Sequence, residues 1–114
     1  MHELSIALNM IDVVTEEAAK HGGSCVKAIH LKLGPLSGVV KEALVGAFEL
    51  ARADSPLAAT ELVIEEMPIL IRCPRCQGPR AIVSLYELAC IECGTASAEV
   101  TQGRELEVTA LEIE

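Results

Sequence analysis

CPRCQGPRAIVSLYELACIEC, residues 73–93, is the stretch that decides how the C-terminal part of this 114-residue chain folds. It begins and ends with a Cys-x-x-Cys pair, and thirteen residues separate the two pairs. Two residues between cysteines let one tight turn present both sulfurs to a single ion, and the longer segment can form a hairpin that brings the pairs together. The spacing therefore predicts a structural Zn(II) site with four thiolate ligands: Cys73, Cys76, Cys90 and Cys93.

Two disulfides are the alternative interpretation of these four cysteines. Disulfides persist in oxidising compartments, whereas the sequence begins Met-His-Glu and shows no apolar signal segment of the secretory type. No apolar run approaches the roughly 18 to 20 residues of a membrane span, so the sequence predicts a cytoplasmic protein with no membrane association. The fifth cysteine, Cys25, has no partner in this scheme, and we expect it to be a small buried or strand-edge residue.

The sequence shows no sign of catalysis. A site with four thiolates leaves no open coordination position, which disfavours catalytic zinc. The chain contains neither a phosphate-binding Gly-rich loop nor a Gly-x-Ser-x-Gly nucleophile elbow. We therefore predict that the protein is not an enzyme.

Its charge disfavours nucleic acid as a partner. Nine Lys and Arg residues stand against seventeen Asp and Glu residues, which gives a formal net charge of −8. Nucleic-acid affinity rests on a basic face that neutralises phosphates, with aromatic side chains for stacking on single strands. Three arginines surround the first cysteine pair without aromatic neighbours: Arg72, Arg75 and Arg80. We expect this small basic spot to meet an acidic partner or to be solvated.

Two amphipathic helices and three strands are predicted outside the cysteine segment. Apolar residues recur every three or four positions over residues 3–20 and 39–53, which is typical of helices. Strands are predicted at residues 26–33, 61–67 and 105–113. Apolar and polar residues alternate clearly in the first and the last of these. The first helix is expected to bury Leu4, Ala7, Leu8, Ile11, Val14 and Ala18. The second, with Ser37 as a candidate N-cap, is expected to bury Val40, Leu44, Ala47, Phe48 and Ala51.

These elements predict an α+β fold in which a small three-stranded mixed sheet carries two helices on one face. The cysteine segment falls between the second and third strands. We therefore expect a discontinuous α+β domain of residues 1–68 and 104–114, with an inserted four-cysteine, zinc-ribbon-like module of residues 69–103.

Of the three histidines, only His2 lacks an ordinary structural explanation. His21 lies at a helix end, where it suits the C-terminal dipole, and His30 lies in mid-strand on the more polar face, where solvation explains it. His2 directly follows Met1, which such a bulky second residue generally protects from removal. The alternative is that His2 is a terminal residue without a function.

Met1 and His2 together can form a chelate. The α-amine, the deprotonated His2 amide and the His2 imidazole close fused five- and six-membered rings around one ion. Such in-plane nitrogen donors suit square-planar Ni(II) or Cu(II) and not zinc. Glu3 can fill a fourth position through its amide or its carboxylate.

Several segments in order along the whole chain resemble the HypA/HybF family of nickel-insertion metallochaperones for [NiFe]-hydrogenase maturation. They are the N-terminal Met-His-Glu, the segment LKLGPLSGV of residues 31–39, the two cysteine pairs and the segment GRELEV of residues 103–108. The resemblance implies an α+β domain that binds Ni(II) with the N-terminus and His2, and a separate zinc module held by the four cysteines. It also implies delivery of nickel to the hydrogenase large-subunit precursor with a HypB-type GTPase. Whether urease maturation proteins are partners as well stays open.

Two other classes of function compete with this one. A zinc-ribbon adaptor would bind protein or nucleic acid and use no second metal, and an enzyme would use catalytic zinc. Metal stoichiometry separates the first two classes. One zinc plus one nickel that is lost without His2 indicates a chaperone, whereas zinc alone indicates an adaptor.

Overall fold

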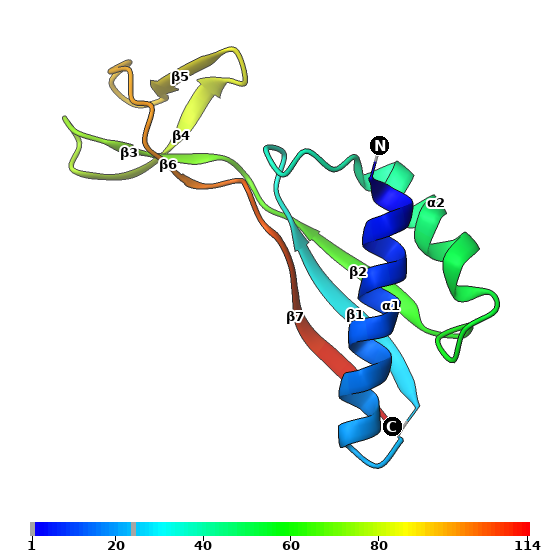
Figure 1. Ribbon diagram of the computed structural model, residues 1–114. Coiled ribbons are helices and arrows are strands. Elements are labelled where there is room, and N and C mark those ends of the chain that lie inside the picture. Colours follow the sequence, from blue (N-terminus) through cyan, green and yellow to red (C-terminus); the bar gives the residue numbers. More distant parts are fainter. Residues whose placement is uncertain (1, 24) are drawn as a thin grey trace. The chain divides into compact units, whose positions relative to one another are not determined.

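The computed structural model describes residues 2–23 and 25–114. This part of the chain contains two helices and seven strands, which are labelled in Figure 1. They are α1 (Glu3–Lys20), β1 (Val26–Leu33), α2 (Lys41–Arg52), β2 (Glu61–Glu66), β3 (Leu70–Cys73), β4 (Gly78–Ser84), β5 (Glu87–Cys90), β6 (Val100–Gln102) and β7 (Leu106–Ile113). The predicted α+β class is confirmed, and α2 is a little shorter than the apolar pattern suggested.

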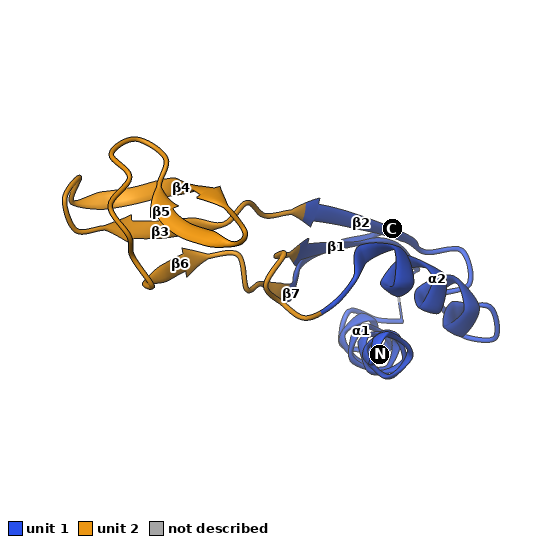
Figure 2. Cartoon of the chain, turned by 90° about the horizontal axis from the view of Figure 1, so that it is seen from above, with its two compact units in different colours: residues 1–32, 39–65, 107–114 blue, residues 33–38, 66–106 orange. Residues whose placement is uncertain are grey.

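The chain divides into two compact units, coloured separately in Figure 2. The first unit consists of residues 1–32, 39–65 and 107–114, and the second consists of residues 33–38 and 66–106. The second unit therefore includes the cysteine segment and also the end of β1 with most of the loop that follows it. The sequence-based boundaries at residues 69 and 103 stay a prediction.

A three-stranded mixed sheet forms the frame of the first unit. Its strand order is β2-β1-β7, with β1 in the centre. In Figure 1 the arrows of β1 and β2 point the same way and that of β7 points the opposite way. Both helices cover the same face of this sheet (Figures 1 and 2). The predicted mixed sheet with two helices on one face is thus confirmed.

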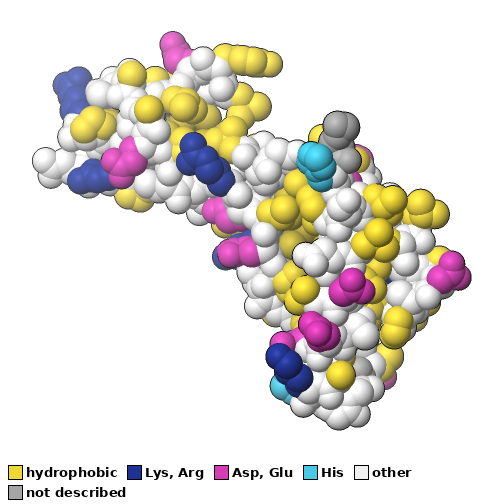
Figure 3. Space-filling view, viewed as in Figure 1, with side chains coloured by type: hydrophobic (Ala, Val, Ile, Leu, Met, Phe, Trp, Pro, Cys, Tyr) yellow, Lys and Arg dark blue, Asp and Glu magenta, His cyan; other side chains and the backbone are white. Residues whose placement is uncertain are grey.

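The buried face of α1 differs from the prediction at two leucines. Leu4 and Leu8 are 48% and 49% exposed, whereas Met10 and Glu3 are buried. Viewed down the helix axis at 3.6 residues per turn, Met10 and Glu3 lie to one side of Ile11, and Leu8 lies to the other side. The carboxylate of Glu3 reaches Val40, just before α2, so the buried face of α1 is rotated towards that helix. Figure 3 shows hydrophobic side chains exposed on the surface formed by α1 and α2.

Val40 was also predicted wrongly, because it is 59% exposed and precedes the helix. It occupies the N-cap position of α2 with an extended backbone, in place of the expected Ser37. Leu44 and Phe48 are the buried residues of α2. They join an aliphatic core with residues from α1 and β1: Ala7, Met10, Ile11, Val14, Ala18, Val26, Ile29 and Leu31.

The second unit is an antiparallel sheet of strand order β5-β4-β3-β6. Its buried hydrophobic residues are few, and two of them are cysteines: Leu33, Ile69, Ile71, Cys73, Ala89 and Cys90. Such a small core supplies little stability by itself, so the unit needs a further source of stability. The four cysteines can provide it by binding a metal.

The loop that follows β1 is held to the segment before β7 within the second unit. The N–H of Gly34 donates to the carbonyl of Glu105 at 2.8 Å, and that of Leu36 donates to the carbonyl of Gly103 at 2.7 Å. A Cβ atom at residue 34 would lie 2.1 Å from the Gly103 oxygen. Only glycine fits this position, which explains the Gly34 of the LKLGPLSGV segment.

Neither of the described helices is long and apolar enough to span a membrane.

Candidate metal centres

The two cysteine pairs meet in the second unit. The sulfur atoms of Cys73, Cys76, Cys90 and Cys93 all lie within 4.8 Å of one another, and none forms a disulfide. The Cys73 and Cys93 sulfurs are 3.5 Å apart, and those of Cys76 and Cys90 are 3.9 Å apart. Four bonds of about 2.3 Å in a tetrahedron place neighbouring sulfurs about 3.8 Å apart. The cluster therefore fits one tetrahedral metal ion.

Two equivalent turns present the sulfurs. The first turn ends with a hydrogen bond from the N–H of Gln77 to the carbonyl of Cys73, and the second ends with one from Gly94 to Cys90, both at 2.8 Å. The N–H of Cys76 also points at the Cys73 sulfur, at 3.3 Å. Backbone N–H groups directed at thiolates stabilise their negative charge, so the first turn prepares the Cys73 sulfur for a cation.

Thr95 adds a hydrogen bond that the sequence analysis did not identify. Its hydroxyl lies 3.2 Å from the sulfur of Cys93. This hydroxyl, followed by the Thr95 backbone N–H, lowers the pKa of Cys93 to about 6. Hydrogen bonding to Cys93 and then burial raise the pKa of Cys76 to about 12. One sulfur of the cluster therefore carries a negative charge at neutral pH before any metal binds.

The N-terminal candidates lie at the start of α1. His2 is exposed and occupies the N-cap position, and its carbonyl accepts a hydrogen bond from the N–H of Ile6 at 2.9 Å. Glu3 is buried, and its carboxylate accepts a hydrogen bond from the N–H of Val40 at 3.5 Å. Met1, the third predicted nickel ligand, lies outside the described residues.

Several groups act on the carboxyl group of Glu3. The α-amino group of the chain lowers its pKa by hydrogen bonding, and the backbone N–H groups of Glu3 and Val40 lower it further against the effect of burial. The carboxylate is therefore charged and held in place by the backbone. Its contact with Val40 is a feature that the sequence pattern could not reveal, because the two residues are 37 positions apart.

The remaining histidines and Cys25 have ordinary surroundings. His21 forms the C-cap of α1, and its Nε2 lies 3.5 Å from a carboxylate oxygen of Glu17. Cys25 is exposed beside the start of β1, and its carbonyl accepts a hydrogen bond from Glu114. His30 is half-exposed in β1, on the polar face as predicted, and contacts Glu112.

Comparison with known proteins identifies the family. A family model described as "Hydrogenase/urease nickel incorporation, metallochaperone, hypA" matches residues 1–113. The chain belongs to the HypA family. Proteins named hydrogenase maturation factor HypA from Chloroflexus aurantiacus and Chlorobaculum parvum are 40% and 42% identical to it. The first match covers 98% of each chain, and the second covers 100% of each.

Solved structures of HypA proteins share the fold. A solution structure titled as that of HypA protein has a TM-score of 0.71 at 27% identity and covers 100% of this chain and 97% of its own. The solution structure of the Ni metallochaperone HypA from Helicobacter pylori has a TM-score of 0.63 at 26% identity, and the match covers 99% and 97%. HypA proteins are nickel metallochaperones and maturation factors, so the family resemblance is confirmed and the chain is not an enzyme.

Proposed function

We propose that this chain binds Ni(II) at its N-terminus and delivers it, with a HypB-type GTPase, to the [NiFe]-hydrogenase large-subunit precursor in the cytoplasm. The observation that carries the proposal is the exposure of His2 at the N-cap of α1, directly before the buried Glu3. An imidazole in this position is accessible to a partner while the helix behind it fixes the start of the chain.

The proposed ligands are the α-amine of Met1, the amide and imidazole nitrogens of His2, and Glu3. The amide nitrogen of Glu3, once deprotonated by the metal like that of His2, would be the fourth in-plane donor. The Glu3 carboxylate accepts hydrogen bonds from Val40 and from its own backbone N–H, and nickel at the amide would remove only the second of these, which favours the amide over the carboxylate. Four nitrogen donors would give square-planar Ni(II).

The four-cysteine cluster is proposed to hold Zn(II) in a structural role, within an inserted module of residues 69–103. The sulfur separations of 3.5 and 3.9 Å support zinc, because they bracket the value for a tetrahedral zinc–thiolate site. Zinc bound there would stabilise a unit that has few buried hydrophobic residues. With all four positions occupied by sulfur, no coordination position would remain for a substrate.

A nickel titration of the zinc-loaded protein tests the proposed function. Wild-type protein should bind one nickel per chain with the visible d–d absorption of a planar ion, and His2→Ala should lose that band. His21→Ala is the matched control, since it also removes an exposed histidine from an end of α1. A d–d band that survives in His2→Ala would exclude the N-terminal site. Zinc binding without any nickel band would instead indicate the adaptor class.

Cells that lack the native gene test whether hydrogenase is the enzyme that receives the nickel. His2→Ala should fail to restore hydrogenase activity, whereas His21→Ala should restore it. Since the family description names both hydrogenase and urease, urease activity in a host that makes both enzymes decides whether urease maturation is a second client.

A further inference from the structure

The sheet of the second unit has one buried face and one exposed face. Ile71 of β3 is fully buried, whereas Arg72 next to it is exposed. Arg72 lies opposite Pro79 of β4, and Leu70 lies opposite Ala81. Because opposite residues of an antiparallel pair share a face, these four side chains lie on the face turned away from Ile71. We call these four residues the outer face, and nothing in the described part of the second unit covers it.

Large hydrophobic side chains adjoin the outer face at the end of the β4–β5 hairpin. Val83, the next residue of β4 with the orientation of Ala81, is 51% exposed, and Leu85 and Tyr86 in the turn are 60% and 99% exposed. Figure 3 shows hydrophobic side chains gathered over β4 and β5. Exposed apolar groups that lie together mark interaction sites, and tyrosine and arginine are common among the residues that dominate protein binding.

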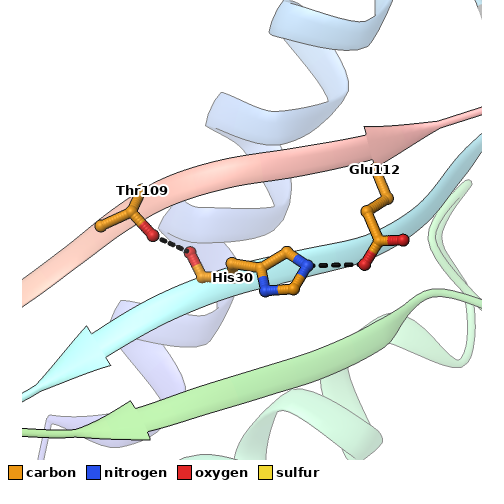
Figure 4. A network of polar contacts seen from close by, with 3 residues as sticks. All are labelled: His30, Thr109 and Glu112. Carbon is orange, nitrogen blue, oxygen red and sulfur yellow. Dashed lines mark hydrogen bonds and ion pairs between the residues drawn. The ribbon is translucent and has the colours of Figure 1, made fainter.

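The arginines of this region lack an internal counter-charge. No ion pair between described residues involves Arg72 or Arg75. The backbone N–H of Arg72 donates to the carbonyl of Glu99 at 2.9 Å, yet the two side chains form no ion pair. On the open sheet face of the first unit, by contrast, His30 contacts Glu112 at 2.6 Å (Figure 4). The guanidinium group of Arg72 is therefore available to a carboxylate of another molecule.

The charge of the second unit favours an acidic protein over nucleic acid. This unit contains four arginines and no lysine, against five glutamates, so it has no net positive charge for binding a phosphate backbone. A second copy of the chain is also disfavoured. A twofold contact centred on the outer face would bring Arg72 against Arg72 of the other copy, and like charges repel.

We propose that the outer face and the end of the β4–β5 hairpin bind an acidic, apolar segment of the protein that receives the nickel. A carboxylate of this segment pairs with Arg72, and an apolar side chain packs on Tyr86. That the receiver is the hydrogenase large-subunit precursor rests on the proposed function. Because the contact needs no nickel, the chain holds the receiver both before and after the ion is transferred.

A peptide array tests the proposal with full-length, zinc-loaded, nickel-free, fluorescently labelled protein. The array carries overlapping peptides of the hydrogenase precursor, of the HypB-type GTPase and of this chain. Acidic precursor peptides with aliphatic residues should bind, and more weakly as the salt concentration rises. Arg72→Gln and Tyr86→Ser should each weaken this binding about fivefold or more. Glu99→Gln should strengthen it, because that change removes a competing carboxylate.

Arg104→Gln and Leu50→Ser are the matched controls. Arg104 is an exposed arginine of the second unit outside β3 and β4, and Leu50 is an exposed apolar residue of the first unit, so both variants should bind like the wild type. Zinc content checks that every variant keeps the second unit folded.

Four results would overturn the proposal: no bound precursor peptide, a preference for neutral or basic peptides or for those of the GTPase or this chain, unchanged binding by Arg72→Gln, or tighter binding of poly(U) RNA. All are measured without nickel. The planar d–d band and its loss in His2→Ala judge the proposed function separately.

Discussion

Gln77 and Gly94 occupy equivalent places in the two cysteine turns. Each donates its N–H to the carbonyl of the first cysteine of its pair at 2.8 Å, and each has a positive φ, 58° for Gln77 and 77° for Gly94. Glycine adopts this left-handed conformation freely, whereas a residue with a Cβ atom is strained in it by about 1 to 2 kcal/mol. The first turn is therefore strained, and the second is not.

Exchanging the residue types at these positions should change stability in opposite directions. We expect Gly94→Gln to destabilise the zinc-loaded second unit by about 1 kcal/mol, and Gln77→Gly to stabilise it by less, because glycine gives the unfolded chain more freedom. Zinc transfer to a competing chelator measures both effects at fixed pH. If Gln77→Gly destabilised the unit instead, the glutamine side chain would stabilise the turn by more than the backbone strain at residue 77 destabilises it.

Thr95 should control the reactivity of Cys93. The pKa of Cys93 is lowered to about 6, so its thiol is deprotonated above that pH and becomes protonated as the pH falls below it. After zinc removal at pH 7, Cys93 should be alkylated before Cys76, whose pKa is raised to about 12. Thr95→Val should slow alkylation of Cys93 about tenfold, as judged by mass spectrometry of the modified peptides.

The control for this experiment is Thr101→Val, which removes an exposed hydroxyl that bonds to the carbonyl of Leu70 and does not bond to a cysteine. Its alkylation profile should match that of the wild type. If Cys93 in Thr95→Val kept its wild-type rate and its pH dependence, the hydroxyl would have no influence on the sulfur.

Loss of one cysteine should unfold the second unit alone. Cys90→Ser removes a buried ligand, so zinc is lost and little else holds that unit together. The first unit keeps its own aliphatic core, so far-UV circular dichroism should retain the signal of α1 and α2. Loss of the helical signal together with zinc would mean that the two units fold as one.

The amine at the start of the chain should prove essential for planar nickel. One or two residues added before Met1 convert its amine to an amide and destroy the five-membered chelate ring, while all side chains stay unchanged. We expect the extended protein to keep zinc and its fold, to lose the planar d–d band, and to fail in hydrogenase maturation. A C-terminally tagged protein is the control. Equal nickel affinity in both proteins would remove the amine from the site.

Glu3→Gln distinguishes an amide ligand from a carboxylate ligand. Glutamine keeps the amide nitrogen and can still accept the hydrogen bond from Val40 through its side-chain oxygen. We therefore expect the wavelength of the nickel band to be unchanged and the affinity to fall only slightly. A shifted band, or a change to octahedral nickel, would assign the fourth position to the carboxylate.

The sequence predicted the elements that local chemistry determines. The apolar pattern predicted the first and last residues of α1 and β1 correctly, and the Cys-x-x-Cys spacing predicted the cluster of four sulfurs. The exposure of Leu4 and Leu8 was missed because apolar periodicity gives a helix face only to within about one residue position, and tertiary packing on α2 decides the rest. Longer-range contacts, such as Glu3 with Val40 and His30 with Glu112, depend on the fold and leave no local pattern.

The site residues also divide into those that a local sequence pattern predicts and those that it does not. Cysteines carry a recognisable spacing, whereas Thr95 is an ordinary threonine until its hydroxyl is seen beside a sulfur. A polar residue two positions after a metal-binding cysteine is the one signal that could have suggested its role. At Gln77 the signal is different: the residue directly follows a cysteine at a position with a left-handed backbone, where glycine is the usual residue.

The position of β7 in the chain determines when the sheet of the first unit can be completed during synthesis. This strand follows the cysteine segment in the chain and is an outer strand of the first unit's sheet, so that sheet is incomplete until residues 106–113 have been made. The cysteine segment is translated before β7 and can take up its ion while β1 still lacks one neighbour. A newly made chain therefore completes its three-stranded sheet only after its metal-binding insert has emerged, and a chain truncated before β7 exposes the unpaired backbone of β1 to aggregation.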